Sequence, residues 1–178
     1  MPSPNLKLLL SRQEIAVLVK RLAQEIDVDY QSRAITVLVV LKGALLFSAD
    51  LIRESQTPVE RLETIHLASY GASVVSSGAV TLKGGLNPQS LAGRDVLVIE
   101  DLVDTGLSLQ ALLSHLEAYQ LRSLRVCALL DKPGRRRTSV RADYVGCVIP
   151  DVFVVGYGMD YAEQYRQLPA IYTLGAGG

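Results

Sequence analysis

A short segment in the middle of the chain combines three carboxylates with a glycine and two hydroxyls. The apolar run 96–99 ends in Glu100 and Asp101, and Asp104 follows three residues later. The next residues, Thr-Gly-Leu-Ser at 105–108, open a run of leucines at helical spacing. The N-terminus of a helix, with a glycine and hydroxyl donors, is suited to binding a phosphate group. Carboxylates only accept hydrogen bonds, so they match the donor pair of a ribose diol.

Three acids beside a phosphate site would repel an anionic ligand unless another group offset their charge. We therefore expect sugar hydroxyls and a metal ion in the same pocket. The simpler alternative is that Asp104 or Thr105 caps a helix, while Glu100 and Asp101 are solvated charges at a strand end. Two carboxylates directly after an apolar strand favour the binding site. The chain has neither the G-x-x-x-x-G-K-S/T pattern of a P-loop nor a G-x-G-x-x-G pattern after a strand.

The elements around this segment alternate between strands and helices. Ser11 and Glu14 form a capping box before apolar residues at helical spacing, which predicts a helix over 11–27. Further helices are predicted at 44–54 and around 109–116, and strands at 35–41, 59–69, 95–101, 124–130, 144–149 and from 152 onwards. This order predicts an α/β fold, with a mostly parallel central sheet flanked by helices, in a single domain over 1–178. Ligands of such sheets bind outside the carboxyl ends of the strands.

Composition and charge argue against several classes of protein. The 18 basic residues balance 18 acidic ones, so no overall field attracts nucleic acid or an anionic membrane. The apolar stretches are too short to span a bilayer, and no secretory signal is apparent. Cys127 and Cys147 lie in apolar runs without CxxC spacing, so we expect buried free thiols in a reducing compartment. These features predict a cytoplasmic protein that binds neither nucleic acid nor membrane.

Several long segments carry a resemblance to a known family. VLVIEDLVDTGLSL at 96–109 resembles the phosphoribosyl pyrophosphate signature of type I phosphoribosyltransferases. Other segments resemble the hypoxanthine (hypoxanthine-guanine) branch of that family: LKGALLFSADL at 41–51, SYGASVVSSG at 69–78, LLDKPGRRR at 129–137 and PDVFVVGYGMDYAEQYRQLP at 150–169. The resemblance implies transfer of the 5-phosphoribosyl group to N9 of a 6-oxopurine in purine salvage, with hypoxanthine the first candidate and guanine the second. It also implies a small hood region and a flexible lid loop.

The resemblance assigns roles to individual residues. Ribose and the 5′-phosphate would be bound by Glu100, Asp101, Asp104, Thr105, Gly106, Leu107 and Ser108. Asp104 would also be the catalytic base that accepts the N7 proton. The purine would contact Lys132 through O6, Phe153 by stacking and the backbone of Val154. Pyrophosphate would contact Lys42, Gly43 and Arg166, in a loop that often has a strained or cis peptide. Mg²⁺ would be bound by Glu100, Asp101 and Asp160, and the lid would act through Ser69 and Tyr70.

Taken singly, several of these residues have simpler interpretations. Lys132 would be a solvated lysine before a Pro-Gly turn, and Phe153 would be a core aromatic. Asp160 and Arg166 would form a surface ion pair that contributes little to stability. The basic run 135–137 is expected to be a solvated loop, because three charges are too few to indicate nucleic-acid binding.

Two other functions remain as alternatives. One is a phosphoribosyltransferase for xanthine, adenine or a pyrimidine, although the segment FVVGYGMDY weighs against it. The other is a non-catalytic RNA-binding regulator on the same scaffold, which would need an extended basic surface that a net charge of zero disfavours. For the enzyme, the resemblance implies a homodimer or homotetramer with small-molecule substrates.

Overall fold

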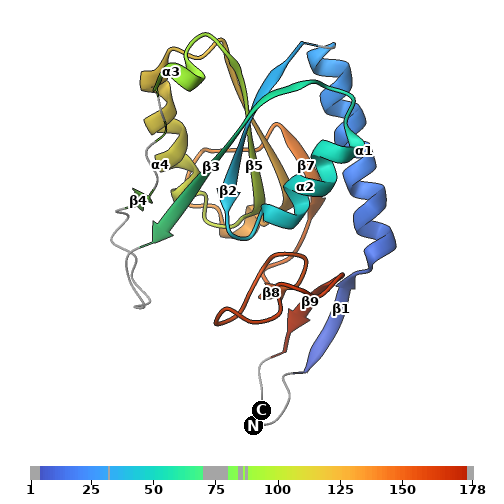
Figure 1. Cartoon of the computed structure of the whole chain (residues 1–178). Helices are drawn as coiled ribbons and strands as arrows, with labels where there is room; N and C mark the ends of the chain where they lie inside the picture. Colours follow the sequence, from blue (N-terminus) through green and yellow to red (C-terminus); the bar gives the residue numbers. More distant parts are fainter. Residues whose placement is uncertain (1–4, 32, 70–79, 84–85, 87, 176–178) are drawn as a thin grey trace.

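A six-stranded sheet forms the centre of the protein (Figure 1). The computed structural model describes residues 5–31, 33–69, 80–83, 86 and 88–175. The strand order is β4-β3-β2-β5-β6-β7, in which β4 is antiparallel to β3 and the other neighbours are parallel. The strands are β2 (Ile35–Leu41), β3 (Val59–Ser69), β4 (Val80–Lys83), β5 (Asp95–Val103), β6 (Ser123–Asp131) and β7 (Tyr144–Val148). The prediction of an α/β fold with a mostly parallel sheet is confirmed.

Helices cover both faces of this sheet (Figure 1). One face carries α1 (Arg12–Tyr30) and α2 (Leu45–Glu54), and the other carries α3 (Pro88–Leu91) and α4 (Leu107–Leu116). Short 3-10 helices span Glu117–Tyr119 and Pro133–Arg135. Successive strand residues face opposite sides, so Val37 and Val39 pack with α1 and α2, while Leu38 packs with α4. This explains why β2 is apolar throughout. None of the helices in the described part of the chain could cross a membrane.

The start of α1 matches the predicted capping box. The hydroxyl of Ser11 accepts a hydrogen bond from the backbone N–H of Glu14 at 3.2 Å, and the Glu14 carboxylate accepts one from the backbone N–H of Ser11 at 2.8 Å. The helix runs three residues past its predicted end at 27 because Tyr30 is buried against the sheet and extends the apolar face.

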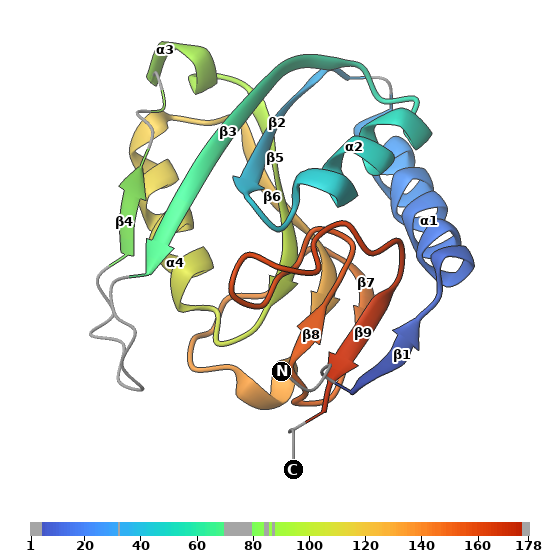
Figure 2. The same cartoon turned by 60° about the horizontal axis from the view of Figure 1, so that its bottom comes forward.

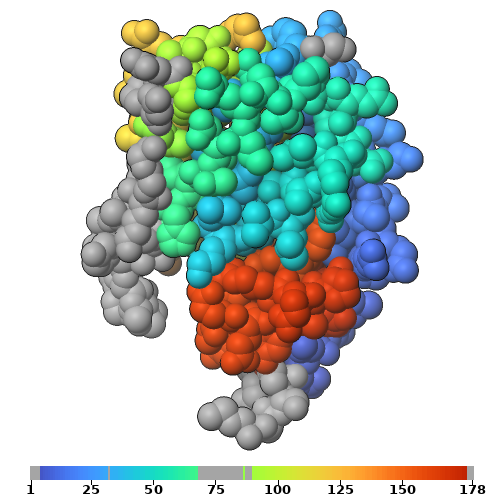
Figure 3. Space-filling view, in the orientation of Figure 1, coloured from blue at the N-terminus to red at the C-terminus, as the bar shows by residue number. Residues whose placement is uncertain are grey.

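A second sheet, antiparallel and three-stranded, joins the two ends of the described chain. Its order is β1-β9-β8, from β1 (Leu6–Leu10), β9 (Ile171–Leu174) and β8 (Val154–Val155). Figure 2 shows these strands side by side below the central sheet. With the connecting residues 156–170 they form the hood, which in Figure 3, in orange and red, packs against the start of α2 in cyan. The hood was predicted, but β1 and β9 had not been predicted as strands.

The two cysteines differ in their surroundings. Cys127 is buried in β6, and burial raises the pKa of its thiol. Cys147, in β7, is only partly buried, and neither residue forms a disulfide. The prediction of free thiols is therefore confirmed, while the prediction of full burial is correct for Cys127 only.

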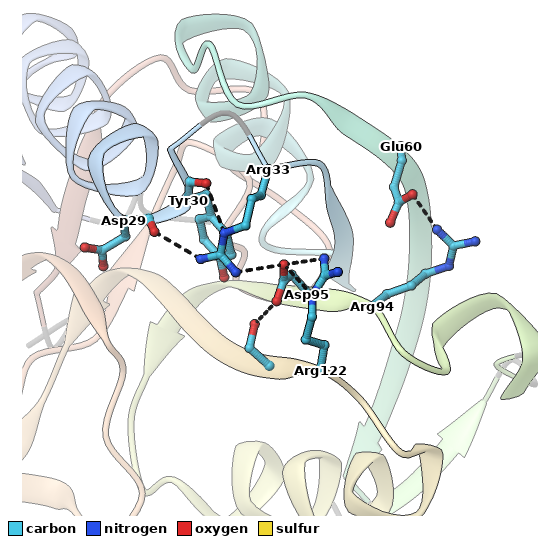
Figure 4. Close-up of polar contacts among 8 residues, drawn as sticks. Asp29, Tyr30, Arg33, Glu60, Arg94, Asp95 and Arg122 are labelled. Carbon is cyan, nitrogen blue, oxygen red and sulfur yellow. Dashed lines mark hydrogen bonds and ion pairs between the residues drawn. The ribbon is translucent and has the colours of Figure 1, made fainter.

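A buried carboxylate connects neighbouring strands at their amino-terminal ends, opposite the predicted site (Figure 4). Asp95, the first residue of β5, has a fully buried side chain. Its carboxylate accepts hydrogen bonds from Arg122 Nε at 2.9 Å, Ser123 Oγ at 2.6 Å and Arg33 Nη1 at 3.3 Å. The hydrogen bond from Arg122 is the main cause that lowers the pKa of Asp95. Because Arg33 precedes β2 and Ser123 begins β6, one side chain connects three neighbouring strands.

We expect Asp95→Asn to lower the free energy of unfolding by about 1–3 kcal/mol at pH 7, because a buried acceptor of charged donors is lost. The folded-state pKa of Asp95 lies below its ordinary value of 3.8. The contribution of the Asp95 carboxylate to the free energy of unfolding is therefore fully present above pH 3.8, the ordinary pKa. It is lost as the pH falls through the folded-state pKa. Urea denaturation at pH 7 and pH 3.5 should show a smaller difference between wild type and variant at the lower pH. Glu117→Gln, at an exposed position, is the control, and a pH-independent difference for Asp95→Asn would contradict this account.

Candidate active site

The predicted motif lies where chain connections leave the sheet in opposite directions. β2 leads through α2 to β3 on one side, and its neighbour β5 leads through α4 to β6 on the other. Such a switch point forms a ligand-binding crevice in open α/β sheets. A cavity of about 750 Å³ lies here, between the strand ends and the hood. The predicted residues that line it are Lys42, Gly43, Glu100, Asp101, Asp104, Thr105, Gly106, Ser108, Lys132, Phe153, Val154, Asp160 and Arg166.

The remaining predicted residues lie elsewhere. Leu107 is the first residue of α4 and does not line the cavity as the structure describes it. The predicted lid covers 69–78, of which Ser69 ends β3, opposite Val80 of β4. Tyr70 and the other lid residues lie outside the described residues.

The surroundings of Glu100 and Asp101 disfavour the ionisation of both carboxyl groups at the same time. β5 extends two residues past its predicted end but pairs with β2 only as far as Ile99, so both carboxylates border the open crevice. Burial is the main cause that raises the pKa of Glu100 well above its usual value, and the charge of Asp101 adds to it. Burial also raises the pKa of Asp101, although the N–H of Leu102 donates to its carboxylate at 2.8 Å. A cation beside the pair would favour ionisation of both acids.

The loop that follows β2 packs directly against one of these acids. A Cβ on Gly43 would lie 1.7 Å from Asp101 Oδ2, and a Cβ on Gly158 of the hood would lie 2.2 Å from the carbonyl oxygen of Gly43. Glycine at both positions therefore allows the carboxylate, the loop and the hood to stack without an intervening side chain. The peptide bond between Leu41 and Lys42 is cis, in the loop for which the resemblance implied that a strained or cis peptide is frequent.

The start of α4 leaves its first amides available to a ligand. Gly106 is the N-cap, with φ +82°, and has no side chain to cap the helix; the Leu107 N–H donates to Thr105 Oγ1 at 3.4 Å, while the N–H groups of Ser108 and Leu109 have no partner among the described residues. A Cβ on Gly106 would lie 2.4 Å from Thr138 Oγ1. Free N–H groups and the positive end of the helix dipole suit a phosphate group.

The cations predicted for pyrophosphate are paired with carboxylates of the hood. Lys42 Nζ lies 3.0 Å from Glu163 Oε2, and Arg166 Nη2 lies 2.8 Å from Asp160 Oδ1 and 3.4 Å from Glu163 Oε2. The hydrogen bond from Lys42 is the main cause that lowers the pKa of Glu163, which keeps this acid charged. Sequence analysis did not identify Glu163, because only the fold brings it to Lys42.

Two residues predicted to contact the purine differ from their simpler interpretations. Lys132 is 4% exposed and lines the cavity, and within the described part of the chain its ammonium has no hydrogen-bond or ion-pair partner. It is therefore not a solvated lysine. Phe153 is 52% exposed and packs edge-to-face on Tyr161, with ring centroids 5.7 Å apart, so it is not a core aromatic.

The basic run 135–137 is not the freely solvated loop that we expected. Arg135 Nε lies 3.3 Å from Asp104 Oδ1, and Arg135 Nη1 lies 3.3 Å from Asp151 Oδ1. Arg136 pairs with Asp131 at the end of β6. The two acids that Arg135 contacts come from other segments, so the sequence contains no local signal for those pairs.

The donor set fits Mg²⁺ that shares its ligands with a substrate. Among the described residues, no group of three or more acids, histidines or cysteines could hold a metal ion by itself. Mg²⁺ usually keeps several waters and binds one or two carboxylates together with substrate phosphates. Glu100 and Asp101 are two such carboxylates. The pKa of each is raised without a cation, so a bound cation would favour their charged forms. Asp160 is already bonded to Arg166 and to the N–H of Glu163 at 2.9 Å, so a metal there would compete with Arg166.

Comparisons with known proteins agree with this geometry. A family model described as the phosphoribosyl transferase domain matches residues 6–162. The hypoxanthine-guanine phosphoribosyltransferase of Bacillus subtilis (strain 168) is 45% identical over 94% of this chain and 92% of its own length. A crystal structure of a hypoxanthine-guanine phosphoribosyltransferase from Bacillus anthracis superposes with a TM-score of 0.90 at 40% identity, covering 97% of this chain and 99% of that chain. A crystal structure of a hypoxanthine phosphoribosyltransferase from Staphylococcus aureus superposes with a TM-score of 0.89 at 38% identity, covering 95% of this chain and 91% of that chain.

We expect Glu100→Gln to raise the free energy of unfolding of the ligand-free protein by on the order of 1 kcal/mol at pH 8. The pKa of Glu100 is raised above 4.5 in the folded state, so the folded protein binds its proton more tightly than the unfolded chain does. Stability therefore falls as the pH rises from 4.5 through the folded-state pKa, and glutamine removes this loss. Urea denaturation at pH 5 and pH 8 would measure the effect, with the exposed Glu54→Gln as control. A variant less stable than wild type at pH 8 would refute the explanation.

Proposed function

The chain belongs to the phosphoribosyltransferase family, and on this premise we propose that it is a purine-salvage enzyme. It transfers the 5-phosphoribosyl group from phosphoribosyl pyrophosphate to N9 of hypoxanthine or guanine, giving IMP or GMP and pyrophosphate. The relatives that it matches over most of their length are named as hypoxanthine-guanine phosphoribosyltransferases, which favours this enzyme over a phosphoribosyltransferase for another base and over an RNA-binding regulator.

One observation carries the assignment of the base: Lys132 lines the cavity with only 4% of its surface exposed, and its ammonium has no partner among the described residues. A base bound in the cavity would supply the acceptor that this ammonium lacks there. The O6 atom of a 6-oxopurine supplies such an acceptor, whereas the amino group of adenine does not. A site built around one donor discriminates strongly, because the wrong base leaves that donor unpaired. Phe153, exposed at the same cavity, offers a face for stacking.

The sugar and its phosphates would occupy the rest of the cavity. The amides at the start of α4, with Thr105 and Ser108, would bind the 5′-phosphate. Glu100 and Asp101 would accept hydrogen bonds from the ribose hydroxyls. Mg²⁺ would be bound through these two acids, with Asp160 the third predicted ligand, and would offset the negative charge of the leaving pyrophosphate.

Asp104 is proposed as the catalytic base. Asp104 lines the cavity close to the amides at the start of α4, which supports a position near C1′ of a bound sugar. As N9 attacks C1′, Asp104 would accept the proton from N7 and so make the purine a better nucleophile. A negative charge here would also stabilise positive charge that develops on the ribose ring. Lys42, Gly43 and Arg166 would bind the pyrophosphate that leaves on the other side.

We extend the proposal to the whole chain and its assembly. Residues 1–178 would form one phosphoribosyltransferase domain of a cytoplasmic enzyme that acts as a homodimer or homotetramer. Exposed apolar side chains on neighbouring α2 and β3, namely Leu45, Leu46 and Leu62, support a surface that a second copy covers. The oligomeric state can be measured by light scattering on the purified protein.

The experiment that tests the reaction is an initial-rate assay with phosphoribosyl pyrophosphate and Mg²⁺. Hypoxanthine, guanine, xanthine, adenine and orotate are offered separately, each with an EDTA control. We expect EDTA-sensitive turnover of hypoxanthine or guanine and little turnover of adenine. Turnover of adenine or orotate at the highest rate, or of no base at all, would overturn the proposed function.

We expect Lys132→Met to raise the KM for the purine about tenfold or more, because a charged hydrogen-bond donor to the base is lost. The KM for phosphoribosyl pyrophosphate should stay within about twofold. Steady-state kinetics measure both KM values, with the exposed Lys20→Met as control. An effect confined to the KM for phosphoribosyl pyrophosphate would show that Lys132 does not contact the base.

A further inference from the structure

We propose that Arg135 is a positioning residue that orients Asp104 for proton transfer. It also connects Asp104 to the segment that precedes Phe153. The inference rests on the proposed function, in which Asp104 is the base. Nothing in the sequence motifs points to Arg135, which belongs to the basic run that we expected to be solvated.

The loop that carries Arg135 contacts the motif loop residue by residue. The backbone N–H of Lys132 donates to the carbonyl oxygen of Val103 at 3.0 Å, and the backbone N–H of Arg137 donates to that of Thr105 at 2.9 Å. Arg135 lies between these two anchors and reaches the residue between their acceptors, Asp104. The backbone therefore fixes where the guanidinium can lie relative to the carboxylate.

The two oxygens of Asp104 are in different surroundings. The side chain is 38% exposed, yet Oδ1 is inaccessible to solvent, so the exposed surface belongs to the rest of the side chain, which includes Oδ2. Oδ1 lies 3.3 Å from Arg135 Nε and has no hydrogen-bond partner among the described residues. Oδ1 thus lies buried beside the guanidinium, which leaves Oδ2 as the oxygen available to a ligand in the cavity that Asp104 lines. A base that accepts a proton at one defined atom requires this asymmetry.

Arg135 also contacts the segment that precedes the purine-stacking residue. Its Nη1 lies 3.3 Å from Asp151 Oδ1, and Asp151 is two residues before Phe153. The Arg135 side chain is 42% exposed, and exposed ion pairs contribute little to stability. A rigid planar fork between two carboxylates is, however, suited to fixing their relative position. We therefore assign Arg135 the role of fixing the relative position of these two carboxylates, and not that of stabilising the fold.

The test compares Arg135→Met, Arg135→Lys and a matched control in the same loop, Arg137→Met. The Arg137 side chain makes no ion pair in the described part of the chain. We expect Arg135→Met to lower the single-turnover rate about tenfold, since small misplacement of a catalytic group is costly. Both KM values should stay within about twofold and the thermal midpoint should not move. Arg135→Lys should be intermediate, because it keeps the charge and loses the fork, and Arg137→Met should match wild type. A loss of purine affinity or of stability with an unchanged single-turnover rate would overturn the proposal.

A double-mutant cycle with Asp104→Asn separates this inference from the proposed function. If Arg135 acts through Asp104, Arg135→Met should have little further effect on the rate of the Asp104→Asn enzyme. Effects that multiply would show that Arg135 acts independently, which would overturn the positioning role while leaving Asp104 as the base. An Asp104→Asn enzyme with unchanged turnover would instead overturn the base assignment and this inference together.

Discussion

Glu100 and Asp101 lie next to each other where β5 continues past its pairing with β2, and the surrounding backbone accommodates them. Adjacent, partly buried acids resist ionising together, and the pKa of each is raised. Because Asp101 fills the space that a side chain on residue 43 would need, the loop after β2 has glycine there. Gly158 is under the same restriction against that loop. The distance between the hood and the sheet thus depends on the Asp101 carboxylate, which contacts the hood only through the loop after β2.

Most charges in the cavity are balanced by other charges of the same chain. The cations at the pyrophosphate end pair with Asp160 and Glu163, and Asp104 pairs with Arg135. In the proposed function, a ligand rich in phosphates would replace carboxylates as the partner of cations that are already in place. Lys132 differs, since it is buried and unpaired among the described residues. Phosphate binding would in this sense be an exchange of partners, while binding of the base would provide Lys132 with a partner.

Features that depend on local sequence could be predicted, and those that depend on distant contacts could not. The strands at 35–41 and 59–69 have their predicted bounds, and the first of them is a β-branched apolar run that ends at a Lys-Gly pair. The motif at 100–108 could be found because its residues are contiguous. β1 and β9 have five and four residues and pair across the length of the chain, so neither has a local signature. Arg135 looked like a solvated charge for the same reason, since Asp104 reaches it only in the folded chain.

The hood is made from both ends of the described chain, and this has a consequence for biosynthesis. β1 precedes the whole central sheet in the sequence, while its partner β9 follows it. During translation β1 therefore leaves the ribosome early and stays without its partner until β2–β7 have been made. The sheet with the motif at 100–108 can assemble while the wall that carries Phe153 is still missing. A nascent chain thus acquires the part of the cavity proposed to bind phosphate before the part proposed to bind the purine, and the cavity is complete only after β9 has paired with β1.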